Sequence, residues 1–236
     1  MMVTIGNFAF RFRNYLFPLA LPLVLLPGPR LFDHYGWAAL LGLLVALAGQ
    51  SVRGMTIALK YIIRGGRDRR VYAEDLVTDG IYAHCRNPMY VGNILMISGV
   101  AITSNSWWCV LTVIPLFTFL YMAIIAAEQA YLEQKFGEPF RAYCRDVPGL
   151  LPRFGGLAAT IGHMEFHWRR LLVKEYGTVF GWVSRWLLVV AWNLWLLGRL
   201  SLDDGAVQAL ITGFLAVLAF WLTVRTLKHR RLMVAD

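Results

Sequence analysis

Long apolar stretches alternate with short polar ones along most of this chain, and the pattern predicts a membrane protein. A run of about 20 apolar residues is long enough to cross a bilayer as a helix. We expect about six such segments, which cover approximately residues 15–31, 37–62, 91–103, 107–127, 178–197 and 206–224. The predicted fold class is therefore all-α, a polytopic bundle of membrane helices.

Composition supports this reading. The chain is 58% hydrophobic and only 16% charged, whereas a soluble domain usually has about a quarter of its residues charged. A net charge of +9 would suit nucleic acid, but no sequence signature of a nucleic-acid-binding module is present. We therefore expect no nucleic-acid partner, and we assign the basic residues to membrane lipids and cytoplasmic loops.

The loops differ sharply in charge, and this difference predicts the orientation. Lysines and arginines crowd the N-terminal arm, the loops after the second and fourth segments, and the C-terminal tail. The opposite loops hold only Arg30 and Arg199. Because basic loops stay on the cytoplasmic side, we expect both termini to be cytoplasmic, in the inner membrane if the protein is bacterial.

The cysteines and histidines predict neither a disulfide framework nor a metal site. Cys85, Cys109 and Cys144 are far apart, and no CxxC pair occurs. His163 and His167 flank Glu165 in the order HxExH, which is not the zinc-protease order HExxH. We interpret these histidines as a surface that faces lipid headgroups and expect no metal.

Two polar segments interrupt the apolar pattern. Residues 76–93 read LVTDGIYAHCRNPMYVGN, and residues 128–152 read EQAYLEQKFGEPFRAYCRDVPGLLP. Polar groups at a bilayer boundary are costly unless they bind something, so we expect a shared site. The domain organisation that follows is an N-terminal pair of helices over 1–65, a site-bearing core over 66–154, an interfacial linker over 155–176 and a C-terminal hairpin with a basic tail over 177–236.

The two polar segments match a known pattern in order and spacing over about 80 residues. The first contributes Leu76-Val77-Thr78, Gly80, Tyr82, Arg86, Asn87-Pro88, Tyr90 and Gly92; the second contributes Glu128, Leu132, Phe136-Gly137, Phe140, Tyr143, Val147-Pro148 and Leu151-Pro152. With these residues the chain resembles the superfamily of isoprenylcysteine carboxyl methyltransferases and phospholipid methyltransferases. The resemblance implies an integral membrane enzyme that uses S-adenosylmethionine, bound from the cytoplasmic side. Its acceptor would be lipophilic and enter from the bilayer: a prenylcysteine-like carboxylate, a lipid amine or another small lipophilic molecule.

The resemblance also implies roles for individual residues. Arg86 and Glu128 are the expected catalytic residues. The expected cofactor-binding residues are Glu74, Asp75, Leu76, Val77, Tyr82, Asn87, Pro88, Met89, Tyr90 and Glu128. The chemistry is consistent, because a carboxylate suits the ammonium or ribose of the cofactor and aromatic faces suit its sulfonium.

Three positions depart from the family pattern. Asn87 replaces the commoner histidine, and Gln129 replaces the second glutamate of an acidic pair. Ile124 stands where the prenylcysteine enzymes carry an arginine that contacts the substrate. The half of the site that holds the acceptor is therefore expected to differ from those enzymes.

Several alternatives stay open from sequence. An NADPH-dependent reductase resembling the sterol reductases is the second hypothesis, with Arg67, Arg69 and Arg70 as candidates for holding the 2′-phosphate. His84 is either a general base or an interfacial side chain. Arg53, near the end of the second apolar segment, is the one intramembrane charge that stands out. The oligomeric state and the role of the C-terminal hairpin are left open.

Overall fold

The computed structural model describes residues 1–19, 21–60, 73–199 and 205–234, and in these ranges the regular elements are helices. They are α1 (Met2–Leu19), α2 (Leu21–Val24), α3 (Tyr35–Leu59), the short 3₁₀ helix η1 (Gly80–Ala83), α4 (Pro88–Thr103), α5 (Trp107–Phe136), α6 (Glu138–Asp146), α7 (Leu157–Gly162), α8 (Trp168–Leu196) and α9 (Gly205–His229). An isolated bridge between Arg30 and Ser106 joins two loops. The predicted all-α class is confirmed.

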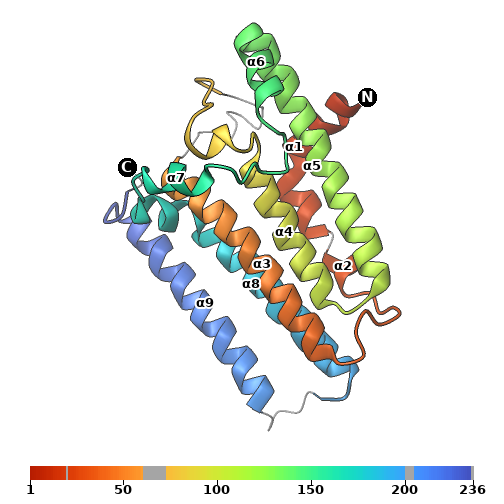
Figure 1. Cartoon of the computed structure of the whole chain (residues 1–236). Helices are drawn as coiled ribbons and strands as arrows, with labels where there is room; N and C mark the ends of the chain where they lie inside the picture. The colour runs from red at the N-terminus through yellow and green to blue at the C-terminus, as the bar shows by residue number, and fades with distance from the viewer. Residues whose placement is uncertain (20, 61–72, 200–204, 235–236) are drawn as a thin grey trace.

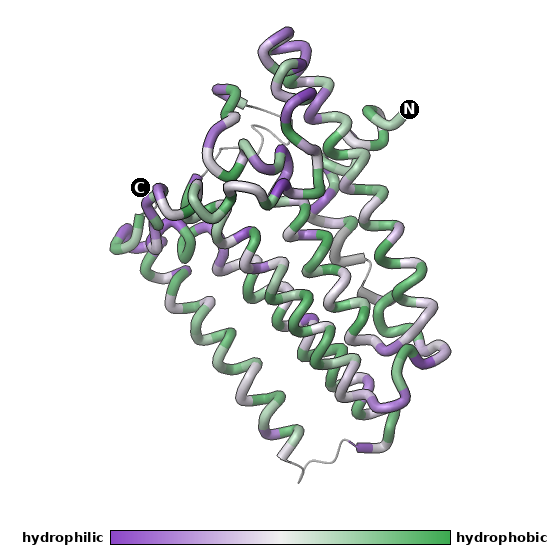
Figure 2. Tube along the Cα trace, viewed as in Figure 1, coloured by the Kyte–Doolittle hydropathy of each residue, from purple (hydrophilic) through white to green (hydrophobic). Residues whose placement is uncertain are grey.

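The long helices form a bundle of roughly antiparallel neighbours (Figure 1). In it α4 packs between α3 and α5, α1 lies against α5, and α8 contacts both α3 and α4, while α9 packs on α8. Both ends of the described chain lie toward the end of the bundle that carries η1, α6 and α7 (Figure 1). Hydrophilic residues gather at this end and apolar residues dominate the bundle's middle (Figure 2).

Among the described residues, four helices are long and apolar enough to cross a membrane: α3, α5, α8 and α9. The helix α4 is apolar but shorter. The predicted integral membrane protein is thus supported, while the count of six segments and the cytoplasmic placement of the termini stay predictions.

The N-terminal region differs from our expectation. We placed the first apolar helix over 15–31, but α1 begins at Met2 and ends at Leu19, and α2 ends at Val24. Proline lacks an amide hydrogen and disfavours helix in the residue before it. Pro27 and Pro29 therefore leave the end of the predicted segment without helix. Similarly, α8 begins at Trp168, inside the stretch 155–176 that we expected to be a linker.

Glycines let α3 and α4 approach closely. A Cβ atom built on Gly99 would lie 2.4 Å from the carbonyl oxygen of Gly42, and one on Gly49 would lie 2.5 Å from that of Gly92. Any larger residue at these positions would collide with backbone. Small residues commonly bring membrane helices together in this way, and here they fix the position of α4, on which half of the candidate site stands.

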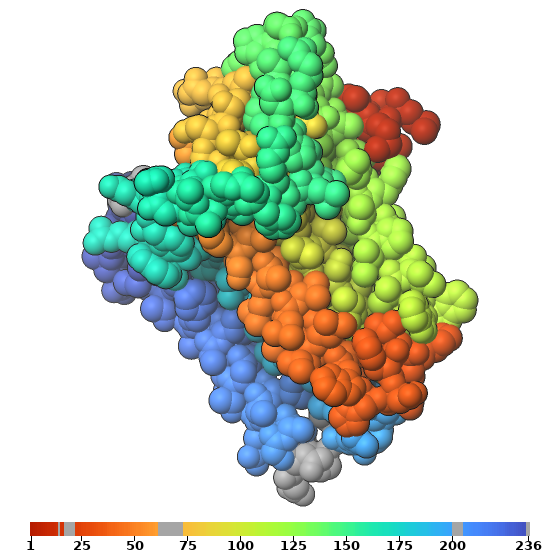
Figure 3. Space-filling model, viewed as in Figure 1, coloured from red at the N-terminus to blue at the C-terminus, as the bar shows by residue number. Residues whose placement is uncertain are grey.

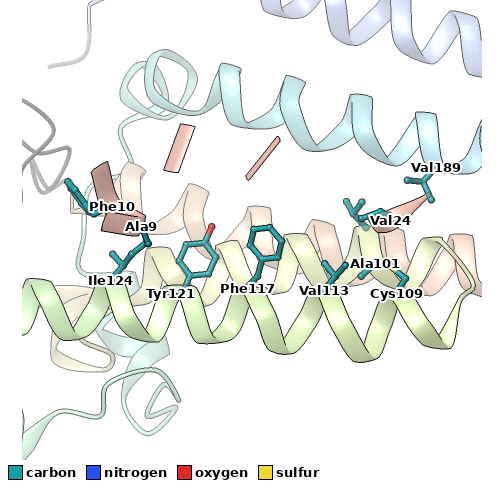
Figure 4. Packing of buried hydrophobic residues seen from close by; sticks show 11 residues of the cluster. Ala9, Phe10, Val24, Ala101, Cys109, Val113, Phe117, Tyr121, Ile124 and Val189 are labelled. Carbon is teal, nitrogen blue, oxygen red and sulfur yellow. The ribbon is translucent and has the colours of Figure 1, made fainter. Parts of the chain in front are cut away.

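The largest buried cluster lies between α1, α4 and α5. Ala9 and Phe10 of α1 pack with Tyr121 and Ile124 of α5, and the cluster continues along α5 through Phe117 (Figure 4). The helix α1 therefore covers the face of α5 that leads up to Glu128.

Candidate functional site

Two stretches far apart in sequence, residues 84–87 and 148–153, are joined by hydrogen bonds that we call the clasp. The backbone amide of Arg86 donates to the carbonyl of Pro148 (3.0 Å), and that of Arg153 donates to the carbonyl of His84 (2.9 Å). The side-chain amide of Asn87 donates to the carbonyl of Gly149 (3.0 Å). The clasp brings the two predicted motif halves together, as the sequence analysis expected.

The side chain of Asn87 takes part in the clasp. Asn87 is the N-cap of α4, yet its side chain makes no capping hydrogen bond and turns to Gly149 instead. Pro88 follows in the first turn of the helix, where its missing amide hydrogen costs nothing. The pair Asn87-Pro88 begins α4, and the Asn87 carbonyl accepts from the amides of Tyr90 and Val91.

Two glycines of the motifs hold backbone conformations that other residues rarely adopt. Gly80 has φ +61° at the start of η1, and Gly137 has φ +61° between α5 and α6. A side chain at either position would be strained. Gly137 lets α6 turn away from α5, and α6 then covers η1: the hydroxyl of Tyr143 donates to the carbonyl of buried Tyr82 at 2.7 Å.

Beside the clasp, α4 and α5 present an acid–phenol pair, in which the acid is buried and the phenol is half-buried. The hydroxyl of Tyr90 donates to Oε1 of Glu128 at 2.6 Å, and Glu128 is only 4% exposed. The ring of Tyr121, two turns before Glu128 on α5, lies 5.4 Å from the ring of Tyr90. The structure thus joins two predicted cofactor residues from different motif halves in direct contact.

The other predicted site residues occupy distinct surroundings. Arg86 donates from Nη1 to the Sγ atom of Cys144 on α6, so it ties the first motif half to the second. Leu76 packs on a second apolar cluster that includes Tyr143, Val77 and Met89 are half-buried, and Glu74 and Asp75 are exposed. The Glu74 carbonyl accepts from Lys135 Nζ at 3.1 Å. The roles assigned to these residues stay predictions.

His84 is part of the clasp. Its Nδ1 lies 3.0 Å from the carbonyl oxygen of Arg153, and its Nε2 lies 2.9 Å from the hydroxyl of Thr160. With both ring nitrogens engaged, the side chain is arranged to hold the stretch 153–160 rather than to take a proton from an acceptor. This geometry favours a structural role over the general base that we considered.

The segment that continues from the clasp lies across the ends of α3 and α4. It forms a continuous band over these helices (Figure 3). The amide of His167 donates to the carbonyl of Ala58 at the end of α3 (3.1 Å). Asp79, beside η1, accepts from Lys60 at 2.7 Å, and this hydrogen bond holds the pKa of the Asp79 carboxyl below its usual value.

Two expectations concern residues outside the pair. Ile124 is 1% exposed and packs against Ala9 and Phe10 of α1, so the position of the missing arginine is covered by α1. Arg67, Arg69 and Arg70, the candidates for a 2′-phosphate site, lie outside the described residues. Among the described residues, no group of three or more histidine, cysteine or acidic side chains gathers as metal ligands.

Sequence reasoning missed a polar network below the site. Arg53 of α3 contacts Asn93 of α4 and Glu175 of α8. Only Arg53 had stood out. The available signal was spacing: Gln50 and Arg53 in one helix, like Glu175 and Thr178 in another, are three residues apart and so share a face.

Known proteins resemble this chain over the part that builds the site. Residues 37–139 match the model of the phospholipid methyltransferase family. The chain is 37% identical over 78 residues to the cobalt-zinc-cadmium resistance protein CzcN of Cupriavidus metallidurans, covering 33% of this chain and 36% of that one. It is 35% identical over 79 residues to the nickel-cobalt-cadmium resistance protein NccN of Alcaligenes xylosoxydans xylosoxydans (34% and 37%).

A third relative is the protein-S-isoprenylcysteine O-methyltransferase of Schizosaccharomyces pombe, which is 34% identical over 77 residues, or 33% of each chain. The matches thus span only about a third of the length of these relatives. No solved structure matches the chain. The superfamily that the motifs predicted is confirmed.

Proposed function

We propose that this chain, whose residues 37–139 match the phospholipid methyltransferase family, is an integral membrane methyltransferase that uses S-adenosylmethionine to methylate a lipophilic acceptor. The observation that carries the proposal is the hydrogen bond between half-buried Tyr90 and buried Glu128. Both residues lie inside the matched segment, and the clasp beside them joins the two motif halves.

The surroundings of the pair fit this cofactor. S-adenosylmethionine, when bound, supplies an activated methyl group on a cationic sulfonium. The Glu128 carboxylate, buried among apolar side chains, suits a cationic amino group or a ribose hydroxyl. The rings of Tyr90 and Tyr121 offer aromatic faces to a cation. We extend the binding role to the remaining predicted residues: Glu74, Asp75, Leu76, Val77, Tyr82, Asn87, Pro88 and Met89.

The acceptor side is proposed from position and charge. The pair stands near the ends of two apolar helices, so an acceptor from the bilayer reaches it without crossing water, and apolar walls exclude water from the reacting atoms. Alignment is then the protein's main contribution. A prenylcysteine-like carboxylate, a lipid amine and other small lipophilic molecules are the proposed classes. The crowding of basic residues in the loops at this end favours a cytoplasmic position for the site.

Cofactor binding tests the proposal directly. Isothermal calorimetry on the detergent-solubilised chain is expected to show S-adenosylmethionine binding, and Glu128→Gln is expected to weaken it about tenfold, since the buried carboxylate is a charged hydrogen-bond partner. The control is Glu133→Gln, an exposed glutamate on the same helix, which is expected to bind like the wild type.

Two results would contradict the proposal that the protein is a methyltransferase. One is a well-folded wild type that gives no heat of binding at near-millimolar cofactor. The other is displacement of bound S-adenosylmethionine by NADPH, which would favour the reductase hypothesis instead.

A further inference from the structure

An ion pair lies among the membrane-spanning helices, directly below the candidate site. Arg53 of α3 and Glu175 of α8 form a two-point salt bridge, in which Nε donates to Oε2 at 3.0 Å and Nη2 donates to Oε1. Gln50 donates to the same carboxylate at 2.9 Å, and Trp182 donates to Gln50 at 2.9 Å. The side chains of Arg53 and Glu175 are only 12% and 3% exposed.

Stability alone does not account for such a pair. Removing two charges from water costs several kcal/mol per ion, and well-packed apolar residues often replace a buried ion pair with no loss of stability. Ionisable residues within membrane helices most often mark function. The question is therefore what this pair holds in place.

The contacts of Arg53 lead toward the candidate site. Its Nη1 donates to Oδ1 of Asn93 at 2.6 Å. Its aliphatic stem crosses Gly92, where a Cβ atom would lie 2.5 Å from the Arg53 Cγ. Asn93 is one turn from Tyr90 on α4. Tyr121 stacks beside Tyr90.

The orientation of the Asn93 amide follows from its neighbour. An arginine only donates, so the Asn93 oxygen must face Arg53. The Asn93 amino group then faces away from Arg53, and the ion pair holds this side chain one turn from Tyr90. Without Arg53, the amide could turn over.

We infer that Glu175 is a positioning residue for the candidate cofactor site, acting through Arg53 and Asn93 on α4 and so on the Tyr90–Glu128 pair. We call these three residues, Glu175, Arg53 and Asn93, the relay. The helix α8 lies outside the matched segment 37–139, so the C-terminal hairpin becomes part of the site. The inference rests on the proposed function, because the property that the relay tunes is binding of S-adenosylmethionine.

A double apolar replacement separates positioning from packing. In Arg53→Met with Glu175→Leu, both charges disappear, so neither is left buried alone and the melting temperature in detergent is expected to stay near that of the wild type. The affinity for S-adenosylmethionine, measured by calorimetry on the full chain, is expected to fall about tenfold because Tyr90 on α4 loses its fixed position.

A double-mutant cycle tests whether the effect travels through Tyr90. Glu175→Gln and Tyr90→Phe are each expected to weaken binding about tenfold, and the combined variant is expected to bind no more weakly than either single variant. A residue that acted only on packing would give independent losses, which multiply to about a hundredfold.

The matched control is Arg185→Met. Arg185 lies on α8 and is half-buried like Arg53, but it donates to the carbonyl of Gly181 in its own helix rather than to the relay. Its replacement is expected to leave cofactor affinity unchanged.

The relay is overturned if the wild type binds the cofactor and the double apolar variant binds it equally well, or if the cycle shows independent losses. A wild type that does not bind at all overturns the proposed function, and the relay falls with it. The two failures are therefore distinguishable.

Discussion

Two helix pairs of this protein are held together in opposite ways. The helices α3 and α4 touch backbone to backbone at four glycines. The helices α8 and α9 instead stand apart on aromatic side chains, with the ring of Phe180 5.3 Å from that of Trp221 and 6.3 Å from that of Phe214. In the described part of α9 only Val224 is buried.

The difference indicates which pair carries chemistry. Backbone contact leaves no freedom for side chains to rearrange, so it holds the positions of Tyr90 and Asn93 on α4 closely. Aromatic contacts accept several packings and leave most of α9 facing lipid. The helix α8 takes part in both kinds of contact. It supplies Glu175 to the relay, and its Phe180 packs against α9.

Adding one methyl group at the tight pair is expected to give the largest effect. Gly99→Ala places a Cβ atom 2.4 Å from a backbone oxygen, so the helices must separate, at a cost of about 3 kcal/mol in the free energy of unfolding. The matched variant is Gly213→Ala on α9, whose Cβ would meet Leu187 at an ordinary 3.5 Å. Thermal melting in detergent compares the two, and equal melting temperatures would contradict the contrast.

Truncation at the loose pair is expected to cost less and to spare the site. Trp221→Ala removes the ring contacts with Phe180 and Tyr176, which are worth about 1 kcal/mol each. Among the described residues, the hydrogen bonds of the relay join side chains of α3, α4 and α8 and involve none from α9. The affinity for S-adenosylmethionine is therefore expected to stay at the wild-type value. A loss of affinity would show that α9 also shapes the site and would erase the distinction between the pairs.

The smallest expected effect concerns pH at the end of α3. Lys60 lowers the pKa of Asp79, so the contribution of this pair to stability is present above the unfolded pKa, about 3.9, and is lost as the pH falls through the folded value. The pair is exposed, so the contribution is at most about 1 kcal/mol. The melting temperatures of wild type and Asp79→Asn are expected to differ at pH 7 and to converge as the pH falls through the folded pKa of Asp79. A difference that does not shrink as the pH falls below about 3.9 would contradict this origin.

Features that depend on residues close together in sequence were predicted correctly. Apolar runs located the helices that became α3, α5, α8 and α9, and the motif spacing brought Tyr90 and Glu128 into one site. The first helix was predicted too late in the chain, because its apolar run continues into a stretch rich in proline, whereas the helix itself covers Met2–Leu19. Spacing marks a polar face on each helix, but the pairing of Arg53 with Glu175 could not be read from sequence, because it depends on how α3 and α8 pack.

The ion pair also has a consequence for how the chain is made. Arg53 leaves the ribosome 122 residues before Glu175, so α3 must enter the bilayer while its arginine still lacks the carboxylate. Insertion of an unpaired arginine at a helix centre costs about 3 kcal/mol, although the position of Arg53 near the end of α3 lets it reach the interface. The helix α3 therefore reaches its final position only after α8 is made. In a nascent chain stalled before Glu175, the first helices are expected to pack only loosely against one another.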